Sequence, residues 1–183
     1  MKTIINVDIQ PEYEKWITFD MHKWVNYINK ISSSNHIVFL YNGKDTIGMI
    51  DEMSYKIWLV ELGFNEDVII NATFYDKGYN FFRPLMDKYI DEKQISRLVK
   101  FMMKNNIYDS RDIDEAKWKK YYNSEIRYLL VHDPIFIPDL MDFIKKYKRI
   151  TLLGGGKNEC LKEVEIALTS LNIKYNLLTQ FIY

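Results

Sequence analysis

Three short and almost continuous apolar runs constrain the fold of this chain most strongly: TIINVDIQ (3–10), HIVFLY (36–41) and RITLLGGG (149–156). Such runs are typical of strands that are buried on both faces of a parallel sheet. Between the first two runs, residues 18–31 are expected to form a helix, because their apolar side chains share one helical stripe. This stripe contains Met21, Trp24, Val25 and Ile28. The pattern therefore predicts a βαβ unit.

The same alternation of strands and helices continues along the chain. Alternation of this kind predicts an α/β fold with a mostly parallel sheet and helices on both of its faces. The polar-rich helical region at 86–126 is expected to be an insertion within a single domain that spans residues 1–183. Further strands are expected within 67–76, 125–133 and 174–183, and further helices within 52–63, 91–106, 137–147 and 158–171.

Composition limits the classes of partner and of compartment. Lys and Arg total 25, and so do Asp and Glu; this balance gives no electrostatic reason to expect nucleic acid or an anionic membrane as a partner. The single cysteine cannot form an intrachain disulfide. The N-terminal stretch contains Asp8 and Glu12, which interrupt the apolar run that a signal peptide needs. We therefore expect a cytoplasmic protein with no nucleic-acid or membrane partner.

Three reactive residues follow the ends of predicted strands. Asp8 lies at the end of the first strand, Lys77 follows the strand at 67–76, and Cys160 follows the strand at 149–156. Ligands of open α/β sheets bind beyond the carboxyl ends of the strands. Because those ends meet at one edge of a parallel sheet, we expect the three side chains to converge there.

These three residue types suit the chemistry of a cysteine hydrolase. A thiolate at a helix N-terminus is favoured by the helix dipole and by the N–H groups of the first turn. The same N–H groups, near Glu159 and Cys160, can hold the oxyanion of a tetrahedral intermediate. Asp8 can take the thiol proton and later deliver it to a leaving amine. Lys77 can stabilise negative charge and keep the carboxylate ionised.

Three motifs resemble those of isochorismatase-like cysteine hydrolases, a superfamily that includes nicotinamidases. DIQPEY at 8–13 resembles the D-x-Q-x-x-F element of that family, with Asp8 at the acid/base, Gln10 at the glutamine and Tyr13 in place of Phe. DKGYNFF at 76–82 resembles its strand-to-loop lysine element. LLGGGKNECLKEVEIAL, from 152 onward, resembles its glycine turn and the helix that opens with the nucleophilic cysteine.

The resemblance implies a fold, a reaction and a set of site residues. The fold is a three-layer α/β/α sandwich, and the reaction is C–N hydrolysis of a small molecule through a thioester on the cysteine. Members of this family commonly form homo-oligomers. The implied catalytic residues are Asp8, Lys77 and Cys160, and the residues expected to bind substrate are Gln10, Tyr13, Phe81, Phe82, Gly155, Gly156 and Glu159.

The sequence differs from that of nicotinamidases in a motif that binds metal. The nicotinamidase metal site uses an Asp-x-His pair after the second strand, and YNGKDTIGM at 41–49 contains none. His22, His36 and His132 are not spaced as ligands. We therefore expect no metal and no other cofactor.

A second interpretation of the glycine turn remains open. Gly154, Gly155 and Gly156 precede a predicted helix, and the N–H groups of such a turn can cradle a phosphate. Lys157 would then neutralise the phosphate charge. On this interpretation the chain is a Rossmann-like nucleotide- or phosphate-binding protein that needs no nucleophile.

Overall fold

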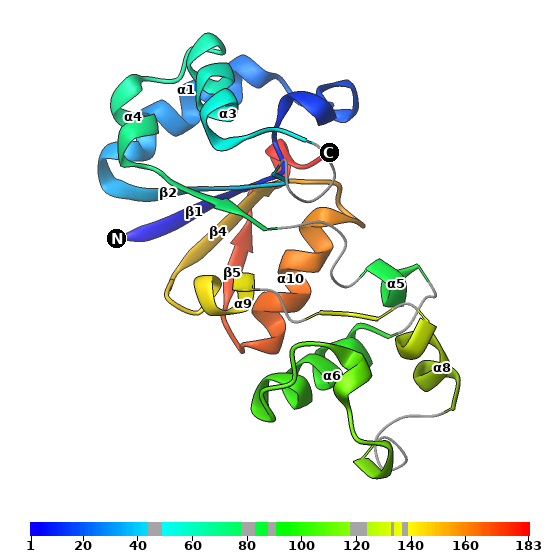
Figure 1. The fold of residues 1–183 in the computed structure, drawn as a ribbon. Helices are drawn as coiled ribbons and strands as arrows, with labels where there is room; N and C mark the ends of the chain where they lie inside the picture. Colours follow the sequence, from blue (N-terminus) through cyan, green and yellow to red (C-terminus); the bar gives the residue numbers. More distant parts are fainter. Residues whose placement is uncertain (44–48, 78–82, 88–90, 118–123, 133, 137–138) are drawn as a thin grey trace. The chain divides into compact units, whose positions relative to one another are not determined.

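A five-stranded, all-parallel sheet organises the α/β fold in the computed structural model of the chain (Figure 1). The model describes all residues except 44–48, 78–82, 88–90, 118–123, 133 and 137–138. The predicted α/β class is confirmed, and the architecture is consistent with a three-layer α/β/α fold. In the sheet order β3-β2-β1-β4-β5, the strands are β1 (Lys2–Val7), β2 (Asn35–Tyr41), β3 (Thr73–Asp76), β4 (Ile150–Gly154) and β5 (Tyr175–Leu177).

The chain divides into two compact units. The first contains Met1–Tyr79, Lys146–Lys162 and Lys174–Tyr183, and therefore holds the whole sheet. The second contains Asn80–Lys145 and Glu163–Ile173, so that the insertion expected at 86–126 falls within it. Among the described residues, no helix has the length and apolar character required to cross a membrane.

Three helices of the first unit pack on one face of the sheet: α1 (Met21–Ile31), α3 (Glu52–Glu61) and α4 (Glu66–Asn71) (Figure 1). Trp24 of α1 and Tyr55 of α3 meet Phe39 of β2 in this core, and all three side chains are fully buried. The Trp24 indole donates to the side chain of Asn6 in β1, at 2.9 Å. This hydrogen bond satisfies a buried polar group within an otherwise apolar layer.

The second unit contains α5 (Arg83–Met86), α6 (Glu92–Lys104), α8 (Ser124–His132), α9 (Asp139–Ile144) and most of α10 (Cys160–Ser170). Within it, Ser170 donates to Ser96 of α6 at 3.1 Å, and Lys100 donates to the Asn172 side chain at 3.0 Å. The helix expected at 91–106 is confirmed, and its apolar stripe is buried; the stripe contains Ile95, Leu98, Val99 and Met102.

Three predicted strands were wrong in whole or in part. In place of the strand expected at 125–133, Ser124–His132 form α8, in which Ile126 and Leu130 are buried one helical turn apart, a spacing that a short apolar run does not distinguish from a strand. The strand expected at 67–76 is α4 followed by the shorter β3. The strand expected at 174–183 ends at Leu177, and a 3-10 helix (Thr179–Phe181) follows it and buries Phe181.

The strand register brings the carboxyl ends of four strands together. Val7 at the end of β1 pairs with Leu40 of β2 on one side and with Gly154 of β4 on the other. Tyr41 at the end of β2 pairs with Asp76 at the end of β3. The strand order changes direction at β1, because β2 and β3 lie on one side of it and β4 and β5 on the other. This edge is where open α/β sheets bind ligands.

Candidate functional site

Asp8 leaves β1 in a conformation that few residues adopt. Its φ is 48°, in the left-handed region, which aspartate tolerates better than most residues. Its N–H donates to the Leu40 carbonyl at 2.9 Å and so extends the pairing between β1 and β2 by one residue. The turn directs the Asp8 carboxylate into a site where the whole residue is 0% exposed.

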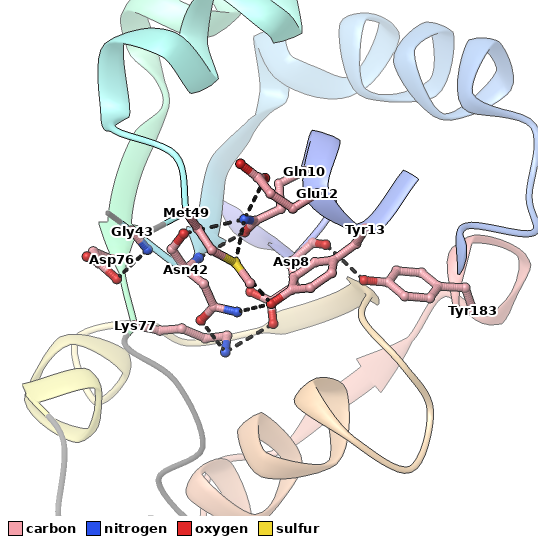
Figure 2. Close-up of polar contacts among 10 residues, drawn as sticks. All are labelled: Asp8, Gln10, Glu12, Tyr13, Asn42, Gly43, Met49, Asp76, Lys77 and Tyr183. Atoms are coloured by element: carbon pink, nitrogen blue, oxygen red, sulfur yellow. Dashed lines mark hydrogen bonds and ion pairs between the residues drawn. The ribbon is translucent and has the colours of Figure 1, made fainter. Parts of the chain in front are cut away.

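Lys77 reaches the Asp8 carboxylate from β3. Its N–H donates to the Tyr41 carbonyl at 3.0 Å, which fixes the backbone beside β2. Its Nζ lies 3.0 Å from Asp8 Oδ2, and both side chains are completely buried (Figure 2). Two charges removed from water are stabilised chiefly by each other, and loss of either leaves a costly unpaired charge. The structure thus brings two of the three predicted catalytic residues into direct contact.

Asn42 connects this ion pair to the predicted substrate-binding residues. Its Oδ1 accepts from Lys77 Nζ at 3.0 Å, and its Nδ2 donates to the Tyr13 hydroxyl at 2.8 Å (Figure 2). Gln10 accepts from the Asn42 N–H at 2.9 Å and donates to the Asn42 carbonyl at 3.4 Å and to the Glu12 carboxylate at 3.0 Å. The Gln10 amide therefore joins the ends of β1 and β2.

Three tyrosines lie close to Asp8, and its negative charge contributes to the pKa of each. The Tyr183 hydroxyl donates to the Asp8 carbonyl at 2.9 Å, and the Tyr55 hydroxyl donates to the Ile9 carbonyl at 2.6 Å. Burial, followed by the negative charge of Asp8, raises the pKa of Tyr13, of Tyr55 and of Tyr183 above the ordinary value. All three hydroxyls therefore stay protonated at neutral pH and act as hydrogen-bond donors.

The Asp8 carboxylate keeps acceptor capacity that the described residues do not use. Neither Oδ1 nor Oδ2 accepts an aligned hydrogen bond from the described part of the chain, although Oδ2 lies against the Lys77 ammonium. A buried carboxylate oxygen without a donor is unusual and costs free energy. Asp8 Oδ1 is thus available to a donor supplied by a ligand or by water.

Cys160 is the first residue of α10 and is half-buried. It follows β4, the strand beside β1, and a thiolate at this position would add to the raised pKa of Tyr13 and of Tyr183, after burial and the charge of Asp8. Both of these tyrosines lie at the Asp8 site. The third predicted catalytic residue therefore lies within electrostatic range of the tyrosines that line the ion pair.

The glycine turn before Cys160 is closely packed. Gly154 and Gly155 have φ of +78° and +67°, and a Cβ on Gly154 would lie 2.4 Å from the Val7 carbonyl oxygen. The Gly155 carbonyl accepts from the Tyr183 N–H at 3.3 Å, and the Tyr183 carbonyl accepts from the Lys157 N–H at 2.8 Å. These glycines allow the turn to pack against β1.

Some of the backbone N–H groups that were predicted to bind an oxyanion or a phosphate already donate hydrogen bonds within the protein. The Glu159 N–H, which the sequence suggested as an oxyanion donor, donates to the Gly156 carbonyl at 2.9 Å, and the Leu161 N–H donates to the same oxygen at 3.3 Å. The Lys157 N–H is taken by Tyr183. Phe81 and Phe82, which were expected to line a substrate pocket, lie outside the described residues.

Two residues of the site were missed by sequence reasoning. Asn42 was not among the predicted site residues, although its place after β2 puts it at the same sheet edge as Asp8. Tyr183 was expected in a strand, and no sequence signal placed its hydroxyl on Asp8. The general rule that residues after parallel strands share one edge could have identified Asn42.

Metal-ligating side chains do not gather in the part of the chain that the structure describes: no three His, Cys, Asp or Glu residues form a group that could hold an ion. The buried cation beside Asp8 is the ammonium of Lys77. No protein family, curated protein or solved structure matches the chain.

Proposed function

We propose that the protein is a cysteine hydrolase that cleaves an amide-type C–N bond of a small molecule. Cys160 is the nucleophile, Asp8 the acid/base and Lys77 the charge stabiliser. The observation that carries the proposal is the buried Asp8–Lys77 pair, whose Asp8 Oδ1 has no hydrogen-bond donor among the described residues. An acid/base needs an oxygen that can exchange a proton with substrate, while its other oxygen is held in place.

The reaction proceeds through two tetrahedral intermediates. The Cys160 thiol gives its proton to Asp8 as sulfur attacks the carbonyl carbon. Asp8 then delivers that proton to the leaving nitrogen, the C–N bond breaks, and an amine or ammonia departs from a thioester. In the second half, water attacks the thioester and gives a proton to Asp8. The acid product leaves, and the proton returns to the Cys160 thiolate.

In this scheme the Lys77 ammonium stabilises the negative charge of Asp8 and does not exchange protons. Its ammonium holds Asp8 Oδ2 and accompanies the carboxylate through each protonation change. Asn42 fixes the ammonium from the other side at 3.0 Å. Because Asp8 and Asn42 follow the neighbouring strands β1 and β2, the cation has little freedom to leave the carboxylate.

The position of α10 supports the nucleophile assignment. β4 pairs with β1 up to Gly154, and the short turn that follows leads directly into Cys160. Tyr183 binds both sides of the site, since its hydroxyl contacts Asp8 and its N–H contacts Gly155. Asp8 and the turn that bears the thiol are therefore held by one residue.

The test is capture of the thioester. The protein is incubated with a panel of small amides, quenched in acid and examined by intact mass. We expect an acyl adduct on Cys160 that hydroxylamine removes, together with release of amine or ammonia. Asp8→Asn is expected to slow turnover by about 10²- to 10⁴-fold, the usual contribution of a general acid/base. Turnover of an identified amide by Cys160→Ala at the wild-type rate would overturn the proposal.

A further inference from the structure

We propose that the Tyr13 hydroxyl donates a hydrogen bond to the oxyanion that forms when Cys160 attacks a carbonyl carbon. This inference rests on the proposed function, because it assigns an oxyanion donor of the same reaction. The backbone N–H of Glu159, which the sequence suggested for this role, already donates to the Gly156 carbonyl at 2.9 Å. A side chain beside Asp8 can supply the donor instead.

The tyrosines beside Asp8 differ in the acceptor of the hydroxyl hydrogen. Tyr183 and Tyr55 donate to backbone carbonyls, at 2.9 Å and 2.6 Å. Tyr13 donates to the sulfur of Met49 at 3.4 Å, and a thioether sulfur is a weak hydrogen-bond acceptor. The hydrogen of Tyr13 can therefore turn to a charged oxygen at little cost, whereas either of the other two hydroxyls would leave a carbonyl without its donor.

Asn42 determines the direction of the Tyr13 hydrogen. Its Nδ2 donates to the Tyr13 oxygen at 2.8 Å, so the hydroxyl accepts on that side and its own hydrogen points elsewhere (Figure 2). Asn42 is itself held on two sides, because its Oδ1 accepts from Lys77 at 3.0 Å and its N–H donates to Gln10 at 2.9 Å. The Tyr13 hydroxyl is therefore oriented before any ligand binds.

A second donor converges on the same sulfur. Gln10 Nε2 lies 3.5 Å from the Met49 sulfur, which the Tyr13 hydroxyl also contacts (Figure 2). Met49 therefore occupies a point at which two side-chain donors meet, and an oxygen placed there would accept from both. Methionine is unbranched and flexible, so a substrate can displace its thioether.

Tyr13 lies within electrostatic range of all three proposed catalytic residues. Burial is the largest cause of its raised pKa, followed by the negative charge of Asp8. A thiolate at Cys160 would raise this pKa further, and the Lys77 ammonium lowers it. Because such effects weaken with distance, the hydroxyl lies near the proposed reacting groups. Its raised pKa keeps the proton on Tyr13, which acts as a hydrogen-bond donor and transfers no proton.

The proposed step conserves charge and protons. The Cys160 sulfur forms a bond to the carbonyl carbon, and the π electrons of the carbonyl move to its oxygen. The Tyr13 O–H turns from Met49 to this oxyanion, where a donor stabilises the charge that develops in the transition state. When the intermediate collapses, the electron pair reforms the carbonyl, the leaving group departs and the O–H returns to Met49.

Two reactions of the same thiol separate this role from a structural one. Acetylation of Cys160 by p-nitrophenyl acetate passes through an oxyanion, whereas alkylation by iodoacetamide displaces iodide and forms none. Both reactions use the thiolate, so the ratio of acetylation rate to alkylation rate is insensitive to the thiolate fraction. Intact mass follows both adducts, and Cys160→Ala gives the background.

Tyr13→Phe is expected to lower this ratio by about tenfold or more, because loss of one oxyanion donor costs about 10²- to 10³-fold in an enzymatic acyl transfer. Phenylalanine keeps the ring that packs against Trp16, with ring centroids 5.9 Å apart, and removes only the hydroxyl. An unchanged ratio in Tyr13→Phe would overturn the proposal. So would a Cys160 that iodoacetamide alkylates in the folded wild type but that the ester does not acetylate.

Two control variants show whether the decrease comes from the donor. Tyr55→Phe removes a nearby hydroxyl whose hydrogen is held by a backbone carbonyl. Met49→Leu removes the acceptor of the Tyr13 hydrogen but keeps the Tyr13 hydroxyl. Both variants are expected to keep the wild-type ratio. A decrease in Met49→Leu equal to that in Tyr13→Phe would assign the effect to the lost contact and overturn the proposal.

This result is separable from the fate of the proposed function. A ratio that falls only in Tyr13→Phe supports the oxyanion donor even if no amide is turned over. Capture of an acyl adduct from an amide, together with an unchanged ratio in Tyr13→Phe, would support the hydrolase and overturn the role of Tyr13. The two experiments therefore fail independently.

Discussion

Replacing Lys77 with methionine is expected to lower the free energy of unfolding by about 3–5 kcal/mol. Methionine keeps the length and apolar stem of the side chain but removes the ammonium that lies 3.0 Å from Asp8 Oδ2. The Asp8 carboxylate would then remain buried and charged without a counter-ion, a state far more costly than the loss of a surface pair. Urea denaturation at neutral pH measures the change.

Two further variants show whether the effect comes from the unpaired charge. Asp8→Asn combined with Lys77→Met leaves no buried charge, so we expect it to be more stable than Lys77→Met alone. Lys56→Met breaks an i, i+4 pair with Glu52 on the surface of α3 and is expected to cost less than about 0.5 kcal/mol. Equal losses in Lys77→Met and in the double variant would contradict the buried pair.

Replacing Gly154 with alanine is expected to destabilise the protein by about 3 kcal/mol or more. Two costs act together at this position. The φ of +78° strains any residue with a Cβ, and that Cβ would lie 2.4 Å from the Val7 carbonyl oxygen and 2.6 Å from the Ile9 side chain. Because the Val7 oxygen belongs to the backbone of β1, it cannot move aside without disturbing the central strand. Thermal and urea denaturation measure the loss.

Gly63 provides the matched control for the packing term. Its φ is +102°, but a Cβ there would meet only the Val25 side chain, at 3.9 Å. Gly63→Ala therefore carries the backbone strain without the overlap, and we expect it to cost about 1 kcal/mol. If Gly154→Ala cost no more than Gly63→Ala, the close approach of the glycine turn to β1 would be wrong.

The sequence predicted the fold class and the central strands because their signals are local. The runs that became β1, β2 and β4 are continuous in apolar residues, and the stripe of α6 has a clear helical period. Residues 125–133 were misassigned because EIRYLLVHD is too short for its period to decide between a strand and a helix. The exposed side chain of Tyr128 decides for the helix, because in a strand it would lie on the same face as the buried Ile126 and Leu130.

The candidate site was predictable where it depends on strand ends. Asp8 and Lys77 follow β1 and β3, and topology alone brings their backbones to one edge. Side-chain contacts from distant segments were not predictable in this way. Tyr183 reaches Asp8 across 175 positions of sequence, and Asn42 joins Lys77 to Tyr13 through both ends of one amide. Such pairings depend on the folded geometry and leave no pattern in the chain.

If Cys160, Asp8 and Lys77 form one site, as proposed, the thiol must respond to both charges, and the pH dependence of Cys160 alkylation by iodoacetamide measures that response. The wild-type profile is compared with those of Asp8→Asn, Lys77→Met and the charge control Lys56→Met, each under conditions in which circular dichroism shows it folded. Removing a negative charge favours the thiolate, and removing a positive charge disfavours it. We therefore expect the midpoint of the profile to move to lower pH in Asp8→Asn, to move to higher pH in Lys77→Met and to stay in place in Lys56→Met. Identical midpoints in all four proteins, or a thiol that reacts only after unfolding, would contradict the account.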